Sequence, residues 1–327
     1  MKTLVLAEAH VALVAGSRAV NDLVQECFRA LALGRGQIFE AGRIQLKDPA
    51  SRCVVKSAYL QEGKALGIKV TRAHPDNPAR HGLPVTNSQI MLVDGETGLL
   101  RALMDGVYVT RLRTGAAAAV GARFLARPDA RCLAIIGAGH QTRTLLEALA
   151  ADRPAVEVWV WSRTAGRRER YADEMSGRLG VTIHPVASIE EACAQAEIIA
   201  TATWSTEPLV RGEWVRPGTF IAAIGADAPG MQELDPDLLP RSTVVVDDLE
   251  QCVRMGEINV PVRHGHYRVD QIHATIGEVV AGLKAGRVDL QETTIFDSTG
   301  IGLQDVIVAD HVCRQATARG IGTWVEL

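Results

Sequence analysis

A glycine turn offers the clearest chemistry in this sequence of 327 residues. The apolar run Leu133–Ile136 leads directly into Gly137-Ala-Gly139, and a helical pattern follows. In a parallel α/β sheet, this order of strand, glycine turn and helix binds a pyrophosphate, because the backbone can approach it closely and the helix N-terminus offers unpaired N–H groups. The alternative is an ordinary strand–helix turn. We predict a dinucleotide site, contacted by Gly137, Gly139, His140, Gln141 and Thr142.

The end of the next strand, 156–161, indicates which dinucleotide the site takes. A site for NAD(H) usually places Asp or Glu there to accept a hydrogen bond from the ribose 2′-hydroxyl. This strand is followed instead by Ser162-Arg163-Thr164, with Arg168 just beyond. Arginine and hydroxyl groups suit a 2′-phosphate, so the pattern favours NADP(H), with NAD(H) possible. The competing interpretation is a solvated helix start.

Three further polar segments follow predicted strands, at the edge where such sheets bind ligands. Asp227 could relay a proton or bind a substrate amine, or it could cap a turn. The hydroxyls of the segment Thr201–Ser205 could face the cofactor or cap the next turn. The segment Asp297–Gly300 presents the same choice between a cofactor contact and a turn. The predicted cofactor contacts in the last two are Thr201 and Thr203, and Asp297, Ser298, Thr299 and Gly300.

The first third of the chain places cations in strand-like patterns. Arg43, Lys56 and Lys69 interrupt otherwise apolar or alternating runs, and Arg113 lies at the edge of a patch of small residues in a helical pattern. The usual fate of a lysine or arginine in a half-buried strand is to point to solvent. These positions alone therefore do not define a site.

Two domains are expected to position these groups. Residues 1–127 and 303–327 are predicted to form a smaller α+β domain, with helices over 16–35 and 107–126 and strands at 42–46, 53–59, 66–70, 88–94 and 99–104. Residues 128–302 alternate strands and helices, which is typical of a doubly wound parallel sheet of the Rossmann type. A helix over 271–285 is predicted to close that domain.

Composition narrows the class of protein. The formal charge of −3 gives no basic surface for nucleic acid or an anionic membrane, and no apolar run approaches the roughly 20 residues of a membrane helix. The six cysteines show no C-x-x-C pair, so neither a zinc site nor a disulfide framework is predicted. We expect a cytoplasmic protein without a metal.

Several longer segments together resemble one family. They are Met104-Asp-Gly106, Arg113-Thr-Gly-Ala116, Ile136–Gln141, Ile224–Gly230 with Gln232–Asp235, Val246–Gln251 with Gly256–Asn259, and Ile295–Gly300 with Gln304-Asp305. In this order, the segments are similar to the ornithine cyclodeaminase/μ-crystallin family over nearly the full length. Within the family, the sequence most resembles the branch of archaeal-type alanine dehydrogenases and ketimine reductases.

The resemblance implies roles for individual residues. Arg43, Lys69 and Arg113 correspond to the cations that hold the substrate carboxylate, and Lys69 would also orient or polarise the reacting bond. Asp227 corresponds to the catalytic carboxylate, and the segment Asp297–Gly300 would lie near the nicotinamide. Members of the family are homodimers that pair through the first domain.

The resemblance leaves three reactions open. The segment Val54–Ser57 contains no acid that could hold the second amine of ornithine, and Lys56 would repel that amine. Together with the expected NADP(H), this favours an oxidoreductase acting on the C–N bond of a small α-amino or α-imino acid. The alternatives are ornithine cyclodeaminase and a cofactor-dependent binding protein of the μ-crystallin type; the presence of Asp227 counts against the binding protein.

Overall fold

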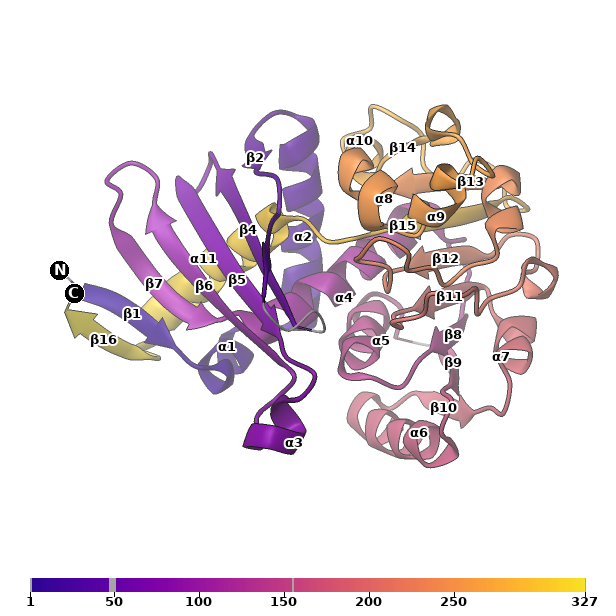
Figure 1. Cartoon of the computed structure of the whole chain (residues 1–327), viewed down its shortest axis with the longest axis horizontal. Helices are drawn as coiled ribbons and strands as arrows, with labels where there is room; N and C mark the ends of the chain where they lie inside the picture. The colour runs from indigo at the N-terminus through magenta and orange to yellow at the C-terminus, as the bar shows by residue number, and fades with distance from the viewer. Residues whose placement is uncertain (1, 47–50, 155, 327) are drawn as a thin grey trace. The chain divides into compact units, whose positions relative to one another are not determined.

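A computed structural model describes residues 2–46, 51–154 and 156–326 of the chain (Figure 1). The chain forms two compact units. The first unit contains residues 1–113 and 301–327, and the second contains residues 114–300. The mixed first unit and parallel second unit confirm the predicted fold class.

The first unit is built on one mixed sheet. Its strands run in the order β16-β1-β7-β6-β5-β4-β2, and β3 also pairs with β4. Neighbours are antiparallel except β1 and β7, which are parallel. The strands are β1 (Lys2–Leu6), β2 (Gly36–Ile38), β3 (Gly42–Gln45), β4 (Arg52–Leu60), β5 (Ala65–Ala73), β6 (Thr86–Asp94), β7 (Leu100–Asp105) and β16 (Thr323–Glu326).

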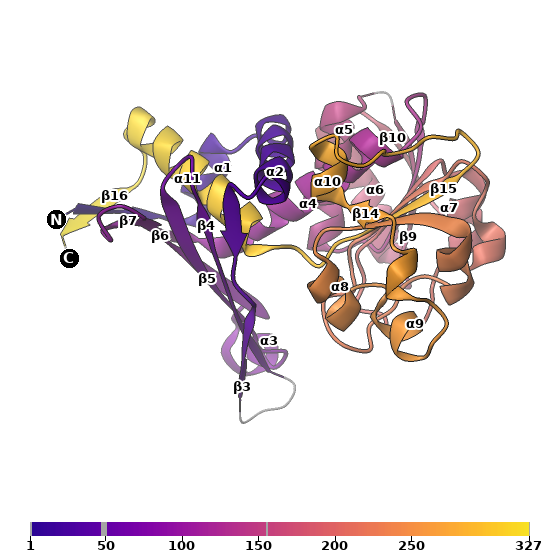
Figure 2. The same ribbon diagram turned by 90° about the horizontal axis from the view of Figure 1, so that it is seen from above.

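Helices cover one face of this sheet. Figure 2 shows α1 (Glu8–Val14), α2 (Ser17–Ala32) and α11 (Gly302–Arg319) on the same side of the strands. Helix α11 packs closely, since a Cβ atom added to Gly67 of β5 would lie 2.5 Å from Val306 Cγ2. Strand alternation follows from this cover: Ser88, Ile90 and Leu92 of β6 are buried, whereas Met91 is exposed. The short helix α3 (Asn77–His81) precedes β6.

The second unit has an entirely parallel sheet, in the order β10-β9-β8-β11-β12-β15-β13-β14. The chain order reverses between β8 and β11, which is where open α/β sheets bind their ligands. The strands are β8 (Cys132–Ile136), β9 (Glu157–Trp161), β10 (Thr182–Pro185), β11 (Ile198–Thr201), β12 (Phe220–Ala223), β13 (Ser242–Val246), β14 (Ala274–Thr275) and β15 (Thr293–Asp297).

The helices of this unit connect successive strands, as expected for parallel pairing. Strands β11 and β12 are buried along their whole length, so the apolar core lies at the centre of the sheet. The helices are α5 (His140–Asp152), α6 (Ala165–Leu179), α7 (Ile189–Gln195), α8 (Leu249–Met255), α9 (Asn259–Arg263) and α10 (Ile276–Val280), with 3-10 turns at η1 (Gly212–Trp214), η2 (Pro236–Arg241) and η3 (Val269–Gln271).

The structure corrects one predicted element. Residues 271–285 do not form one helix: β14 adds to the sheet at Ala274–Thr275, and only Ile276–Val280 is α-helical. Thr275 and Glu278 form a capping box that starts this helix. Gly282, with φ of +75°, lies just beyond its end. Periodicity of apolar residues could not separate an edge strand followed by a short helix from one long helix.

The two units divide inside helix α4 (Gly106–Leu125), between Arg113 and Thr114, whereas the sequence placed the boundary at 127/128. The small residues of α4 explain the difference. A Cβ atom on Gly115 would lie 2.3 Å from the carbonyl oxygen of Thr144, and one on Gly121 would lie 2.7 Å from the ring of Phe296. The second half of α4 is therefore a packed part of the second unit.

Candidate functional site

The predicted glycine turn lies at the end of β8. Gly137 has φ of +113°, which L side chains rarely adopt, and its N–H donates to the carbonyl of Trp161 over 2.8 Å. Gly139 is the N-cap of α5, where no side chain caps the helix, and a Cβ atom added to it would meet nothing within 4 Å. The turn and the uncapped helix end fit a pyrophosphate.

The other predicted contacts in this segment differ in accessibility. His140 is exposed and Gln141 is half-buried. Thr142 is buried; its hydroxyl donates to the carbonyl of Gly139, and its own carbonyl accepts from the hydroxyl of Tyr171. Thr142 therefore takes the position of the usual third glycine as a packed residue, and its hydroxyl is used within the turn.

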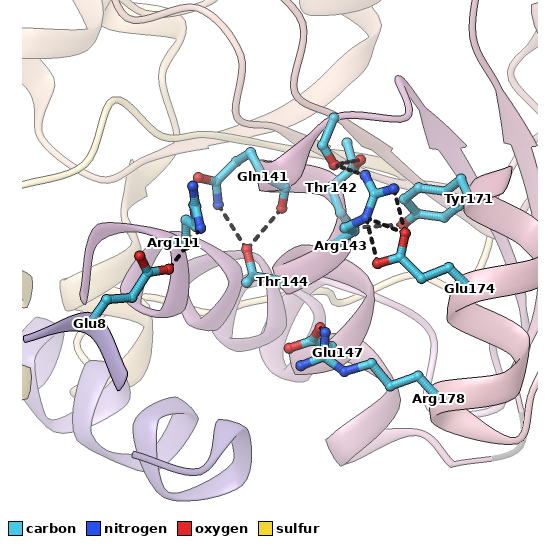
Figure 3. Close-up of polar contacts among 11 residues, drawn as sticks. Glu8, Arg111, Gln141, Thr142, Arg143, Thr144, Glu147, Tyr171, Glu174 and Arg178 are labelled. Carbon is cyan, nitrogen blue, oxygen red and sulfur yellow. Dashed lines mark hydrogen bonds and ion pairs between the residues drawn. The ribbon is translucent and has the colours of Figure 1, made fainter. Parts of the chain in front are cut away.

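A side chain that the sequence did not single out braces the same turn. Arg143 donates to the carbonyl oxygens of Ala138 (3.2 Å) and Gly139 (2.9 Å), and to both carboxylate oxygens of Glu174 on α6 (Figure 3). Its guanidinium carbon lies 5.1 Å from the centre of the Tyr171 ring. Hydrogen bonds from Arg143 lower the pKa of Glu174. The glycine turn is thereby fastened to α6.

At the end of β9, two of the four predicted residues are open to a ligand. Arg163 and Thr164 have exposed side chains. Ser162 is buried and donates to the carbonyl of Thr164, while Arg168 donates to the carbonyl of Ser162 over 3.3 Å. Ser162 and Arg168 hold the turn, and the side chains of Arg163 and Thr164 are exposed beside it.

The loops after β11 and β12 share one buried carboxylate. Glu233 is fully buried, and its Oε1 accepts from the N–H and hydroxyl of Thr203, over 2.6 and 2.7 Å. Its Oε2 accepts from the Thr201 hydroxyl (2.6 Å) and the Gly225 N–H (2.8 Å). Burial raises the pKa of Glu233 despite these hydrogen bonds. The hydroxyls of Thr201 and Thr203, predicted to face a cofactor, are both donated to Glu233.

The predicted catalytic residue Asp227 lies in the second of these loops and has an exposed side chain. The loop is also held at its far end, because Asn259 accepts from the N–H of Gly230 (2.9 Å) and donates to the carbonyl of Met231 (2.9 Å). Asp227 is thus presented from a short segment that buried groups hold on both sides.

The segment after β15 is organised by another buried acid, Asp247. Its carboxylate accepts from the hydroxyls of Ser298 (2.7 Å) and Thr299 (3.3 Å) and from the N–H of Gly300 (2.6 Å). Asp297 is fully buried and accepts from the N–H of Ile258. Burial, aided by the charge of Asp247, raises the pKa of Asp297 to about 7. The hydroxyls of Ser298 and Thr299 and the N–H of Gly300 are thus bonded within the protein, and these bonds fix the backbone of the segment.

In the first unit, a cluster of buried charges includes two of the predicted substrate ligands. Lys69 Nζ lies 2.6 Å from Asp305 Oδ2 and donates to the Thr110 hydroxyl over 3.1 Å. Arg113 Nε lies 3.2 Å from Asp305 Oδ1. Only 4% of Lys69, 6% of Arg113 and 2% of Asp305 is exposed. When all three groups are ionised, the cluster keeps one positive charge, which suits an anionic ligand.

The charges within this cluster affect one another. Burial lowers the pKa of Lys69 to about 7, and the attraction of Asp305 offsets this only in part. Burial alone would raise the pKa of Asp305, but the charges of Lys69 and Arg113 outweigh burial and hold that pKa below its usual range. Lys69 thus combines a fixed position with a pKa close to neutrality.

The structure places Lys56 beside this cluster and Arg43 on a neighbouring strand. Lys56 of β4 stands directly opposite Lys69 of β5, and its charge contributes to lowering the pKa of Lys69. Arg43 lies on β3, opposite Val54, with an exposed side chain. Of the predicted substrate ligands, Lys69 and Arg113 thus share one cluster through Asp305, Lys56 lies next to it, and Arg43 lies on β3, which pairs with the strand of Lys56.

Residues 2–46, 51–154 and 156–326 contain no group of three or more His, Cys, Asp or Glu side chains placed to hold a metal ion. Within the same ranges, every helix is too short or too polar to cross a membrane.

The parallel sheet with its glycine turn defines a dinucleotide-binding domain of the Rossmann type. Residues 1–320 match the ornithine cyclodeaminase/mu-crystallin family, so the chain belongs to that family.

Named relatives cover the whole chain. Alanine dehydrogenase of Archaeoglobus fulgidus is 39% identical over 328 residues, covering 100% of this chain and 99% of the relative. Iminosuccinate reductase of Paracoccus denitrificans is 34% identical, covering 99% of this chain and all of the relative. The solved structure of Thermococcus litoralis Δ1-pyrroline-2-carboxylate reductase, in complex with NADH and L-proline, is 34% identical with a TM-score of 0.94, covering 98% of this chain and 99% of that one.

A solved archaeal alanine dehydrogenase dimer with bound NAD has a TM-score of 0.95 and 38% identity, with full coverage of both chains. These comparisons confirm the predicted family. The residues that sequence reasoning passed over, namely Glu233, Asp247 and Asp305, all lie in the segments that carry the family resemblance. Arg143, a fourth such residue, lies in the first turn of α5, just beyond the glycine turn.

Proposed function

We propose that this protein is a nicotinamide-dependent oxidoreductase that acts on the C–N bond of a small α-amino or α-imino acid. The relatives that cover the full chain include an alanine dehydrogenase and two imine reductases, which supports this reaction class. The observation that carries the proposal is the buried cluster of Lys69, Arg113 and Asp305. Its two cations outnumber its one carboxylate, and the remaining positive charge would attract the carboxylate of such a substrate.

The residues would divide the work as follows. Lys69 and Arg113, with Arg43, bind the substrate carboxylate, and Lys69 also polarises the reacting C=N bond. Asp227 gives a proton to the substrate nitrogen in reduction and takes it back in oxidation. The glycine turn and the N-terminus of α5 hold the pyrophosphate of the cofactor. When bound, the nicotinamide supplies or accepts the hydride.

We infer that NADP(H) is preferred over NAD(H). Related structures contain NAD+ or NADH, so a nicotinamide cofactor is well supported for the family. The finer preference rests on Arg163 and Thr164, which are exposed at the end of β9, where no acidic residue would repel a 2′-phosphate.

We infer that the protein is a homodimer paired through the sheet of the first unit. Val5, Leu103, Met91 and Ile68 stand side by side across four strands, on the face opposite α11. Leu103 and Met91 are 37% and 36% exposed. An apolar row of this kind is typical of a protein interface. The double substitution M91E/L103E should give a monomer by sedimentation, whereas L283E, on an exposed residue of the second unit, should not.

The cysteines support location in a reducing compartment, which we take to be the cytoplasm. All six lie within the described ranges, and none forms a disulfide.

One set of assays tests the proposed reaction. The purified protein is incubated with cyclic α-imino acids, or with 2-oxo acids and ammonia, and the oxidation of NADPH or NADH is followed by absorbance. Net oxidation of the cofactor supports the proposal. Formation of proline from ornithine with catalytic NAD+ would identify a cyclodeaminase instead. Cofactor binding without turnover on any substrate would point to a binding protein.

A further inference from the structure

Glu233 stands out because all four side-chain hydrogen bonds that its carboxylate accepts come from the end of β11 or from the loops after β11 and β12, which carry predicted site residues. Each carboxylate oxygen accepts one backbone N–H and one hydroxyl: Oε1 from Thr203, and Oε2 from Gly225 and Thr201. The two backbone donors belong to the loops after β11 and β12. A single buried side chain therefore joins two neighbouring loops at the carboxyl edge of the sheet.

The fit between Glu233 and Gly225 is close. A Cβ atom on Gly225 would lie 2.5 Å from the Glu233 carboxyl group and 2.4 Å from the carbonyl oxygen of Thr203. Gly225 begins the short segment that contains Asp227, and Asn259 holds the other end at Gly230. The backbone on both sides of Asp227 is consequently fixed from inside the protein.

We propose that Glu233 is a positioning residue, whose carboxylate sets the place of Asp227 by holding the backbone N–H groups of Thr203 and Gly225. The inference rests on the proposed function, because it takes Asp227 as the proton relay. Glu233 itself is fully buried and touches neither substrate nor cofactor in this role. Displacement of a proton relay by a fraction of an ångström slows the chemical step without removing the cofactor site.

Glu233→Gln tests the proposal at constant size. An amide side chain has one accepting oxygen and one donating NH2 group, whereas Glu233 receives a backbone N–H on each oxygen. In either orientation, the NH2 group would face a backbone N–H that cannot reverse. The variant must therefore release either Thr203 or Gly225. We expect kcat to fall about 10- to 100-fold while the Kd of the cofactor changes less than about threefold.

Glu257→Gln is the matched control. Glu257 is also a buried carboxylate in the same region, and its Oε1 accepts from the N–H groups of both Glu233 and Leu234, over 3.0 and 2.7 Å. The N–H of Glu233 also lies 3.0 Å from Oε2, but a glutamine oxygen in the place of Oε1 can accept from both N–H groups, so neither is released. This variant should retain kcat within about threefold. Equal losses in the two variants would overturn the proposal, because the cause would then be the loss of any buried carboxyl group in this region.

A readout of the chemical step separates positioning from general damage. In E233Q, the kinetic isotope effect with cofactor deuterated at nicotinamide C4 should increase, because hydride transfer becomes more rate-limiting. E233Q should also add little to the loss already caused by D227N, since both act through one group. Fully additive losses with an unchanged isotope effect would overturn the proposal.

Hydrogen exchange tests the same contacts in the unaltered protein, should E233Q fail to fold. The backbone amides of Thr203 and Gly225 should exchange as slowly as those of the buried strands β11 and β12. Exchange as fast as in exposed loops would overturn the proposal. If the unaltered protein oxidises or reduces no substrate, the proposed function fails, and the exchange measurement still decides whether Glu233 holds the loops.

Discussion

Lys69 and Asp305 form a buried ion pair with 2.6 Å between Nζ and Oδ2, although one lies on β5 and the other on α11. Arg113 contacts the second oxygen of the same carboxylate. Two buried cations with one anion are only partly compensated. A substrate carboxylate would complete the balance, which agrees with the role proposed for Lys69 and Arg113.

The first prediction concerns pH. The pKa of Lys69 is lowered to about 7, and only the protonated amine attracts a carboxylate. Below pH 7, Lys69 is charged and kcat/KM for the substrate should be constant with respect to this group. Above about pH 7, kcat/KM should fall roughly tenfold per pH unit, as the charged fraction falls. K69R, which stays charged, should lack this break; a profile with the same break would contradict the assignment.

The second prediction concerns Asp305→Asn. Loss of this carboxylate leaves two buried cations without their partner, which should cost about 3–5 kcal/mol of stability in chemical denaturation. The charge of Asp305 raises the pKa of Lys69, so its removal should move the break in kcat/KM to lower pH. Asp310→Asn is the control, because Asp310 is a buried acid on the same helix that pairs with Arg101 and Arg314. It should lose stability without moving the break.

The third prediction uses two glycines. G139A should leave the melting temperature nearly unchanged, because the added Cβ meets no protein atom within 4 Å and φ is ordinary there. Cofactor affinity should nevertheless fall about tenfold or more, because the methyl group would occupy the place of the pyrophosphate. G115A should have the opposite effect. Its Cβ would lie 2.3 Å from the carbonyl oxygen of Thr144, so the melting temperature should fall, while the cofactor affinity of the folded protein should change little. Unchanged cofactor affinity in G139A would exclude this turn as the site.

The sequence predicted those features that local patterns determine. The strand, glycine turn and helix at 132–152 leave a signature in consecutive residues, and the family resemblance singled out Lys69 and Arg113, which the structure joins in one cluster. β1 was not predicted, because Lys2–Leu6 is a short run whose strand character comes from pairing with β7 and β16.

The buried acids show what the sequence could not supply. Glu233, Asp247 and Asp305 are charged residues without local periodicity, and composition alone predicts that such residues face water. Each can be buried because it accepts hydrogen bonds from, or forms ion pairs with, residues in distant parts of the chain. Their partners become visible only when the strands are placed side by side.

The fourth prediction concerns Arg143, which braces the glycine turn. R143K keeps the positive charge but cannot contact both the turn carbonyls and the two oxygens of Glu174. Cofactor Kd should increase about tenfold while kcat at saturating cofactor changes little. R178K provides the control, because Arg178 pairs with Glu147 over 2.9 Å between the same two helices and does not contact the turn (Figure 3). Similar changes in both variants would mean that general helix packing is responsible.

The last prediction concerns cofactor preference and Arg163. A guanidinium group that binds a 2′-phosphate contributes about 1.5–3 kcal/mol through charge-assisted hydrogen bonds. R163A should therefore increase KM for NADPH about 10- to 100-fold and leave KM for NADH nearly unchanged, as measured by initial rates with each cofactor. Salt should weaken NADPH binding in the unaltered protein more than in R163A. R170A, at an exposed arginine within α6, should affect both cofactors alike and only slightly. If R163A changed the two KM values equally, the 2′-phosphate would have no contact with Arg163, and preference for NADP(H) would lose its structural basis.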